Sequence, residues 1–199
     1  MTRAHAETVA DAVSPRKLAH VVLRTRDRYR EMVDWYRTVL NARVVVASPF
    51  MTFLTYDDEH HRVAIVHTPD AATPQGKTIG LDHLAFTYDS LADLLANHRR
   101  LKAAGIEPFC PVNHGPTTSM YYNDPDGNRV ELQIDNFTTM EEAVEVMGAM
   151  SGRNPLGVLF DPDAFANQLA GGADPAELIR YGPDNEQPLD PRLAKILLG

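Results

Sequence analysis

KLAHVVL at residues 17–23 and GLDHLAF at residues 80–86 are two similar stretches with the apolar character of β-strands. Each carries a histidine at its fourth position, His20 in the first and His83 in the second. In a chain with an internal duplication, equivalent positions of the two repeats meet at a pseudo-two-fold axis. We therefore predict that the chain contains two repeats and that both histidines lie near that axis.

The same order of elements follows each stretch. In the first repeat, apolar spacing and turn residues predict a helix after the first strand, with strands at residues 18–25, 43–48, 51–56 and 62–68. In the second repeat they predict a helix around residues 91–101, with strands at residues 79–88, 106–112, 117–122 and 129–135. The sequence thus predicts an α+β fold of two tandem βαβββ modules, at about residues 17–68 and 79–137, forming one metal-holding cup.

Glu131 lies on the polar face of the last expected strand, because Val130, Leu132 and Ile134 alternate with it on the other face. His20, His83 and Glu131 can then line the same cup. Two imidazoles and one carboxylate can hold a divalent metal and leave several coordination positions free, which is typical of non-haem Fe(II) oxygen chemistry. We predict these three residues as the metal ligands.

The composition narrows the classes of protein further. A formal charge of −8 disfavours nucleic acid as a partner. Cys110 is the single cysteine, which excludes an intrachain disulfide and predicts a cytoplasmic protein. No apolar run approaches the roughly 20 residues that span a bilayer, so we expect no membrane span.

Both ends of the chain are expected to lie outside the predicted domain, which we place at residues 17–137. Residues 1–16 are expected to form an N-terminal tail. The pattern beyond this domain predicts a C-terminal extension at residues 138–199, with a helix at 140–150, a short helix at 175–181 and a polar tail. The sequence leaves open whether this extension covers the cup or forms a subunit contact.

The turn and strand NDPDGNRVEL at residues 123–132, which deliver Glu131, are diagnostic of a known superfamily. Together with the duplicated unit and its two histidines, they resemble the vicinal oxygen chelate superfamily of glyoxalases, fosfomycin- and bleomycin-resistance proteins and extradiol dioxygenases. The resemblance covers about two thirds of the chain, from Lys17 to Phe137.

Two further segments resemble one-domain type I extradiol ring-cleaving dioxygenases. EHHRVAI at residues 59–65 is similar to their His-His segment, in which the second histidine is the acid/base. This resemblance assigns that role to His61. NHGPTTSMY at residues 113–121 is similar to the stretch that places a histidine and a tyrosine beside the bound diol. The resemblance assigns those roles to His114 and Tyr121. The adjacent Tyr122 is the alternative to Tyr121 as the tyrosine beside the diol.

The resemblance implies an Fe(II)-dependent enzyme, with Mn(II) as the alternative metal, that cleaves the ring of a substituted catechol with O2. It also implies a homodimer or a higher homo-oligomer. The first alternative is a glyoxalase- or epimerase-like isomerase, which needs a fourth ligand. The last strand of the first module offers only His67 for this purpose, and alignment with the dioxygenases places Ile65 at the fourth position.

The second alternative is a non-enzymatic drug-binding resistance protein, which has no need for His20, His83 and Glu131 together. Metal content distinguishes it from both enzymes. A contribution of His60 to the site stays open.

Overall fold

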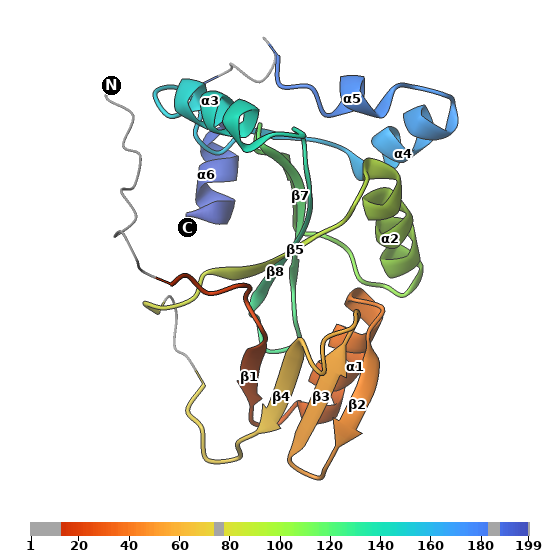
Figure 1. Ribbon diagram of the computed structural model, residues 1–199, viewed down its shortest axis with the longest axis vertical. Helices are drawn as coiled ribbons and strands as arrows, with labels where there is room; N and C mark the ends of the chain where they lie inside the picture. The colour runs from red at the N-terminus through yellow and green to blue at the C-terminus, as the bar shows by residue number, and fades with distance from the viewer. Residues whose placement is uncertain (1–12, 74–77, 183–187, 199) are drawn as a thin grey trace.

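The computed structural model describes residues 13–73, 78–182 and 188–198, and its fold is α+β, as predicted (Figure 1). The first twelve residues of the expected N-terminal tail lie outside these ranges. The first module contains β1 (Val21–Thr25), α1 (Tyr29–Val39), β2 (Arg43–Ala47), β3 (Met51–Thr55) and β4 (Val63–His67). Its sheet has the order β1-β4-β3-β2, with β1 parallel to β4.

The second module repeats this arrangement with β5 (His83–Thr87), α2 (Leu91–Ala103), β6 (Cys110–Asn113), β7 (Thr117–Asn123) and β8 (Arg129–Asp135). Its sheet has the order β5-β8-β7-β6-β9, with β5 parallel to β8. The two sheets are separate, and β1 and β5 are each the outermost described strand at one side of their sheet. The predicted tandem modules are therefore confirmed.

Three strands begin three or four residues later than predicted. The pairing of β1 with β4 begins at Val21, and the pairing of β5 with β8 begins at His83. Apolar residues before these points, such as Leu18 and Leu81, are 77% and 71% exposed. Among the described residues no neighbouring strand pairs with these stretches, and a strand needs one to satisfy its backbone hydrogen bonds. The strand expected at 106–112 likewise begins only at Cys110.

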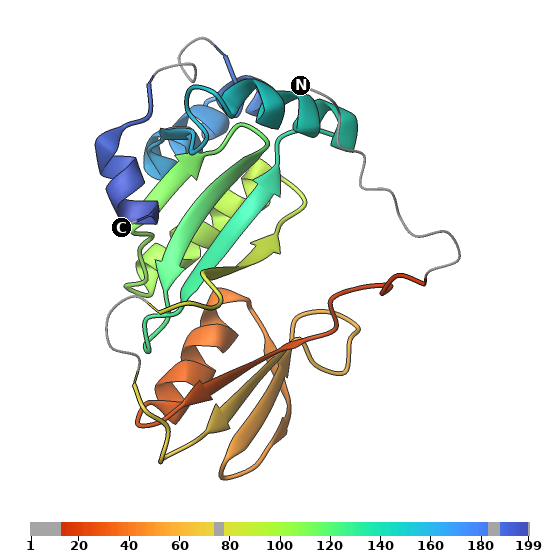
Figure 2. The same ribbon diagram turned by 90° about the vertical axis from the view of Figure 1, so that its left-hand side faces the viewer.

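Helices α1 and α2 join the two modules through one core. Buried residues from both modules form a single hydrophobic cluster that includes Tyr36 of α1 and Leu94 of α2. Two buried polar contacts cross between the modules: the Tyr36 hydroxyl donates to Asp124 at 3.0 Å, and Asn97 donates to the Val39 carbonyl at 3.4 Å. The modules thus contact each other through the faces that carry the helices, stacked along the long axis (Figures 1 and 2).

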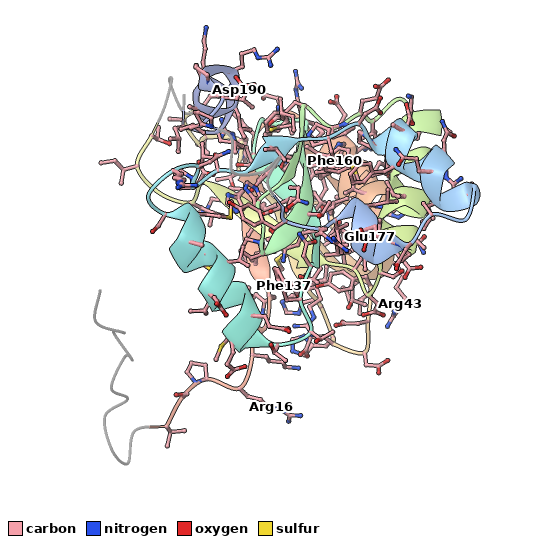
Figure 3. All side chains as sticks on the ribbon, turned by 90° about the horizontal axis from the view of Figure 1, so that it is seen from above. Arg16, Arg43, Phe137, Phe160, Glu177 and Asp190 are labelled. Atoms are coloured by element: carbon pink, nitrogen blue, oxygen red, sulfur yellow. The ribbon has the colours of Figure 1, made fainter. Side chains whose placement is uncertain are left out.

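The C-terminal extension contains α3 (Met140–Met150), β9 (Val158–Leu159), α4 (Pro162–Ala170), α5 (Pro175–Leu178) and α6 (Pro191–Leu197). It packs on the second module: β9 pairs with β6, and α6 buries Leu193 against the sheet, while α3 projects to one side after Phe137 (Figure 3). None of the described helices is long and apolar enough to cross a membrane.

The sequence reasoning missed α4 and α6, and the tail that it took for polar forms α6. A signal was available. Asp161 and Asp190 each cap a helix that begins with proline, and their side chains accept the first free backbone N–H groups.

Candidate metal and substrate site

Glu131 and His83 form the centre of the site in the second module. Strand pairing places Ala85, Glu131, Tyr121 and Cys110 in one row across the sheet, on the face opposite α2. His83 Nε2 lies 3.0 Å from Glu131 Oε2, and His83 Nδ1 lies 2.8 Å from Asp82 Oδ2. Glu131 is 4% exposed, so its carboxylate is held in place by packing as well as by hydrogen bonds.

The pKa values of this pair follow from their contact. The hydrogen bond to Glu131 raises the pKa of His83 to about 9, against the opposing effect of burial. Burial by itself raises the pKa of Glu131, but hydrogen bonds from His83 and Ser119 outweigh it and leave that pKa lowered. Without a metal the pair is therefore an imidazolium and a carboxylate. A metal that binds here must displace the proton from His83.

Tyr121 and His114 extend this half of the site. His114 Nε2 lies 3.0 Å from the Tyr121 hydroxyl, and Tyr121 also hydrogen-bonds Glu131. Burial and the neighbouring Glu131 raise the pKa of Tyr121, so it stays a phenol at neutral pH. Tyr122 points to the opposite face, where it is fully buried with its hydroxyl 3.8 Å from Met120 Sδ. Of the two tyrosines, Tyr121 is thus the one beside Glu131.

His20 and His61 form a second group, in the first module. Their ring centroids lie 4.2 Å apart, and the centroid of the His61 ring also lies 4.7 Å from that of the Phe53 ring. The exposed His60 places Nδ1 2.6 Å from Nδ1 of His61. Burial, together with the nearby His20 and His60, lowers the pKa of His61, which favours its neutral form.

Arg62 fixes the backbone next to His20. Its guanidinium donates to the carbonyls of Leu18 and Ala19 at 2.8 and 3.1 Å, and it also binds the Asp57 carboxylate at 2.9 Å. That pairing with Arg62 lowers the pKa of Asp57 to about 2. Among the described residues the stretch before β1 has no strand partner, and this clamp, together with the Val21 N–H that donates to the Arg62 carbonyl at 3.0 Å, helps to hold His20 at the edge of the sheet.

The predicted ligands fall into two groups. His83 and Glu131 converge, whereas His20 lies with His61, and the described residues contain no cluster of three His, Cys, Asp or Glu side chains able to hold a metal. Two imidazoles and a carboxylate suit Fe(II) or Mn(II) chemically. The geometry of one chain, however, supplies only two of the three. The structure thus places the three residues in two groups, and their joint role as metal ligands stays a prediction.

Strand β4 offers no fourth ligand at the position equivalent to Glu131. His83 corresponds to His20, and Ala85, whose partner is Glu131, corresponds to Val22. The partner of Val22 is Ala64, so Ala64 and not Ile65 occupies the position equivalent to Glu131. His67 lies at the other end of β4, paired with Thr25 and stacked 5.7 Å from Tyr29. The four residue-to-residue steps from Val63 to His67 span about 13 Å of strand, which excludes His67 as a ligand beside His20.

Three contributors escaped the sequence reasoning. Ser119 hydrogen-bonds Glu131, Asp82 hydrogen-bonds His83, and the backbone carbonyl of Leu156 hydrogen-bonds His114. Ser119 could have been found, because it precedes Tyr121 by two residues and therefore shares its face of the strand. The Leu156 contact could not, since it comes from the extension, 42 residues away.

Comparison with known proteins gives consistent matches. A model of the Glyoxalase/Bleomycin resistance protein/Dioxygenase superfamily matches residues 17–132. Biphenyl-2,3-diol 1,2-dioxygenase 2 of Rhodococcus globerulus is 51% identical over 158 residues, which cover 78% of this chain and 83% of that protein. Biphenyl-2,3-diol 1,2-dioxygenase 3 of the same organism is 48% identical over 169 residues, which cover 83% and 88%.

Solved structures of distant sequence share the fold. A glyoxylase/bleomycin resistance protein/dioxygenase domain from Frankia sp. EAN1pec has a TM-score of 0.51 at 22% identity, covering 61% of this chain and 99% of that one. A fosfomycin resistance protein from Listeria monocytogenes has a TM-score of 0.50 at 22% identity, covering 66% and 98%.

Proposed function

The chain belongs to the glyoxalase/bleomycin resistance protein/dioxygenase superfamily, and from that premise we propose that it is an extradiol dioxygenase acting on an aryl-substituted catechol. One observation carries the proposal: two biphenyl-2,3-diol 1,2-dioxygenases are about half identical to this chain over most of both lengths. The substrate class is therefore biphenyl-2,3-diol and related 3-substituted catechols, cleaved with O2 beside the diol. We place this activity in the cytoplasm, in keeping with the single, buried Cys110.

The proposed metal is Fe(II), held by His20, His83 and Glu131. When bound to such a set, Fe(II) has free positions for both oxygens of a diol and for O2. The isomerase alternative loses support because it needs a fourth ligand, and the equivalent position is occupied by Ala64. The drug-binding alternative loses support because the dioxygenase relatives match most of the chain.

His61 is the proposed acid/base. Its lowered pKa makes it a neutral imidazole at pH 7, able to accept a proton from a substrate hydroxyl and return it later. Phe53 packs beside it and forms part of an apolar row with Val22 and Val46, which suits an aromatic ring. His61 and its surroundings can therefore contact the ring and take its proton.

Tyr121 and His114 are proposed to orient the diol. The Tyr121 hydroxyl lies between two acceptors, the Glu131 carboxylate and His114 Nε2. With Glu131 serving as a metal ligand, the Tyr121 hydroxyl would donate its hydrogen bond to His114 Nε2 alone. The Tyr121 oxygen then accepts a hydrogen bond from the substrate hydroxyl, which fixes which oxygen of the diol stays protonated.

The test is oxygen uptake by protein reconstituted anaerobically with Fe(II), with biphenyl-2,3-diol, catechol and a 4-substituted catechol compared side by side. We expect uptake with a yellow ring-fission product, greatest for the 3-aryl compound. His61→Ala should abolish or severely slow uptake while the protein keeps its iron. An iron-loaded protein that consumes no oxygen with any of these diols would refute the proposal.

A further inference from the structure

We propose that Arg129 is a positioning residue of the metal site, which holds Asp82 against the imidazole of His83 and fastens the end of α6 beside it. This inference rests on the proposed function for the role of His83 as a metal ligand. Arg129 is the cross-strand partner of His83 in the pairing of β5 with β8, and it precedes Glu131 by two residues. Its side chain therefore lies on the same face of the sheet as the Glu131 carboxylate.

Asp82 sets which nitrogen of His83 is available to a metal. Its Oδ2 lies 2.8 Å from His83 Nδ1, so the proton on Nδ1 is donated to this carboxylate and Nε2 is the nitrogen that can ligate a metal. Nε2 is also the nitrogen that faces Glu131, at 3.0 Å. The Asp82 side chain is 66% exposed, however, and holding an exposed charged side chain in one geometry costs entropy. A contact that restricts this side chain therefore helps to keep it on His83.

The Arg129 guanidinium supplies such a contact. Its Nη1 lies 3.7 Å from Asp82 Oδ1, the oxygen other than the one that binds His83. The guanidinium carbon also lies 5.7 Å from the centroid of the Phe109 ring. The Arg129 side chain is 25% exposed, so it is more enclosed than the Asp82 carboxylate that it faces. A series of contacts thus runs from the metal site outward, from imidazole to carboxylate to guanidinium.

The last turn of α6 holds the other side of this guanidinium. Nη1 donates to the Leu197 carbonyl at 3.0 Å, and Nη2 donates to the Ile196 carbonyl at 3.1 Å. The last carbonyls of a helix have no partner within it, and the negative end of the helix dipole favours a cation there. α6 itself is anchored by Leu193, which is buried in a cluster with Tyr121 and Cys110. Figure 1 shows α6 and α2 on opposite sides of the second sheet, so α6 lies on the face of the metal site.

These contacts are expected to act on metal affinity more than on folding. A partly exposed ion pair such as that of Asp82 and Arg129 adds little to the free energy of unfolding. A group that orients a metal-binding histidine, by contrast, typically changes metal affinity by about 10–100-fold. Leu193 provides the matched control, because it anchors the same helix through apolar packing.

The experiment measures Fe(II) affinity by anaerobic competition with a chelator. We expect Arg129→Ala and Asp82→Asn each to weaken Fe(II) binding by about tenfold. Arg129→Lys should lose less, because lysine keeps the charge but lacks the fork that reaches the carbonyls and the carboxylate together. Since the two residues act through one contact, the double variant D82N/R129A should bind no more weakly than the weaker single variant. Leu193→Ala should loosen α6 but bind Fe(II) like wild type.

A purely structural anchor predicts another pattern, in which R129A and L193A lower Fe(II) affinity alike and D82N leaves it unchanged. That pattern, wild-type affinity in R129A, or losses that multiply in the double variant would overturn the inference. Circular dichroism and urea unfolding check each variant, and if R129A does not fold, R129K and D82N carry the same test.

The outcome is separable from that of the proposed function, because Fe(II) affinity needs no turnover. A protein that shows the expected pattern of affinities but consumes no oxygen would fail the proposed function alone. A wild-type protein that binds no Fe(II) would overturn both.

Discussion

Nδ1 of His114 lies 2.7 Å from the backbone carbonyl of Leu156, in the C-terminal extension. A carbonyl can only accept, so this nitrogen carries a proton, and in neutral His114 the other nitrogen, Nε2, is left as an acceptor for the Tyr121 hydroxyl. Burial lowers the pKa of His114 and keeps it neutral. The extension thus fixes the tautomer of a residue proposed to act on the substrate.

Gly157 tests this link, because it holds the extension against β6. Its φ is +89°, and a Cβ there would lie 1.9 Å from the Asn113 carbonyl oxygen. We expect Gly157→Ala to destabilise the protein by about 2–4 kcal/mol, from backbone strain plus this clash, and to slow turnover. Gly172→Ala is the matched control, since Gly172 has φ +90° with nothing within 4 Å. Equal losses in urea unfolding would contradict the role of the contact.

Ser119 is expected to position the metal-binding carboxylate. It is fully buried and hydrogen-bonds Glu131. Removing a hydrogen bond that orients a ligand costs typically about 10–100-fold in metal affinity, and we expect this of Ser119→Ala. Thr117→Val is the control, because the Thr117 hydroxyl oxygen lies 3.3 Å from that of Ser119 and its removal leaves the Ser119 side chain in place. Iron affinity measured by competition with a chelator should fall for S119A and not for T117V.

His61 and His60 provide a neighbouring pair with opposite expectations. His61 is half-buried against His20 and Phe53, whereas His60 is exposed. If His61 is the acid/base, His61→Ala should lower kcat by about 10²–10⁴-fold, the usual contribution of such a group. His60→Ala should lower it by less than about tenfold, through the lost contact with His61. Similar effects of the two substitutions on steady-state turnover would contradict the assignment of His61 as the acid/base.

Asp57 and Arg62 predict a pH-dependent stability. Pairing with Arg62 lowers the pKa of Asp57 from 3.8 to about 2, so the folded state favours the ionised carboxylate. Its contribution is present above pH 4 and is lost as the pH falls toward 2. The pair is partly exposed, so Asp57→Asn should cost no more than about 1 kcal/mol at pH 7.

The difference in the free energy of unfolding between wild type and D57N should become smaller when denaturant unfolding is repeated at pH 3. The same variant should weaken iron binding at pH 7, because Arg62 holds the backbone before His20. A stability difference that grows on acidification would contradict the clamp.

Much of the fold could be predicted from local patterns. Alternation along residues 129–135 placed Glu131 on the face opposite the core, and the repeated histidine stretches indicated the duplication. The turn at residues 123–128 could also be predicted from the sequence, since the Asp124 side chain accepts hydrogen bonds from the nearby backbone N–H groups of Asp126 and Asn128. Such features depend on residues close in sequence, which is why they can be recognised without a structure.

Other features depended on register. Alternation alone showed that Tyr121 and Tyr122 face opposite ways, but only the pairing of Tyr121 with Glu131 decided which one lies at the site. Register also shows that Ala64, and not Ile65 as predicted, is the residue equivalent to Glu131 in the first module. A strand's own sequence specifies its two faces, whereas its neighbour across the sheet is set by long-range packing.

The sequence by itself determined the duplicated modules, the two histidines and the carboxylate that suit a metal, and the chemistry those groups favour. Only the tertiary structure decided that His20 lies with His61 and not with His83 and Glu131, and that Leu156 of the extension, 42 residues beyond His114, sets the tautomer of His114. The physical reason is that periodicity specifies which side chains share a face. What comes to cover that face is decided by the packing of segments distant in the chain.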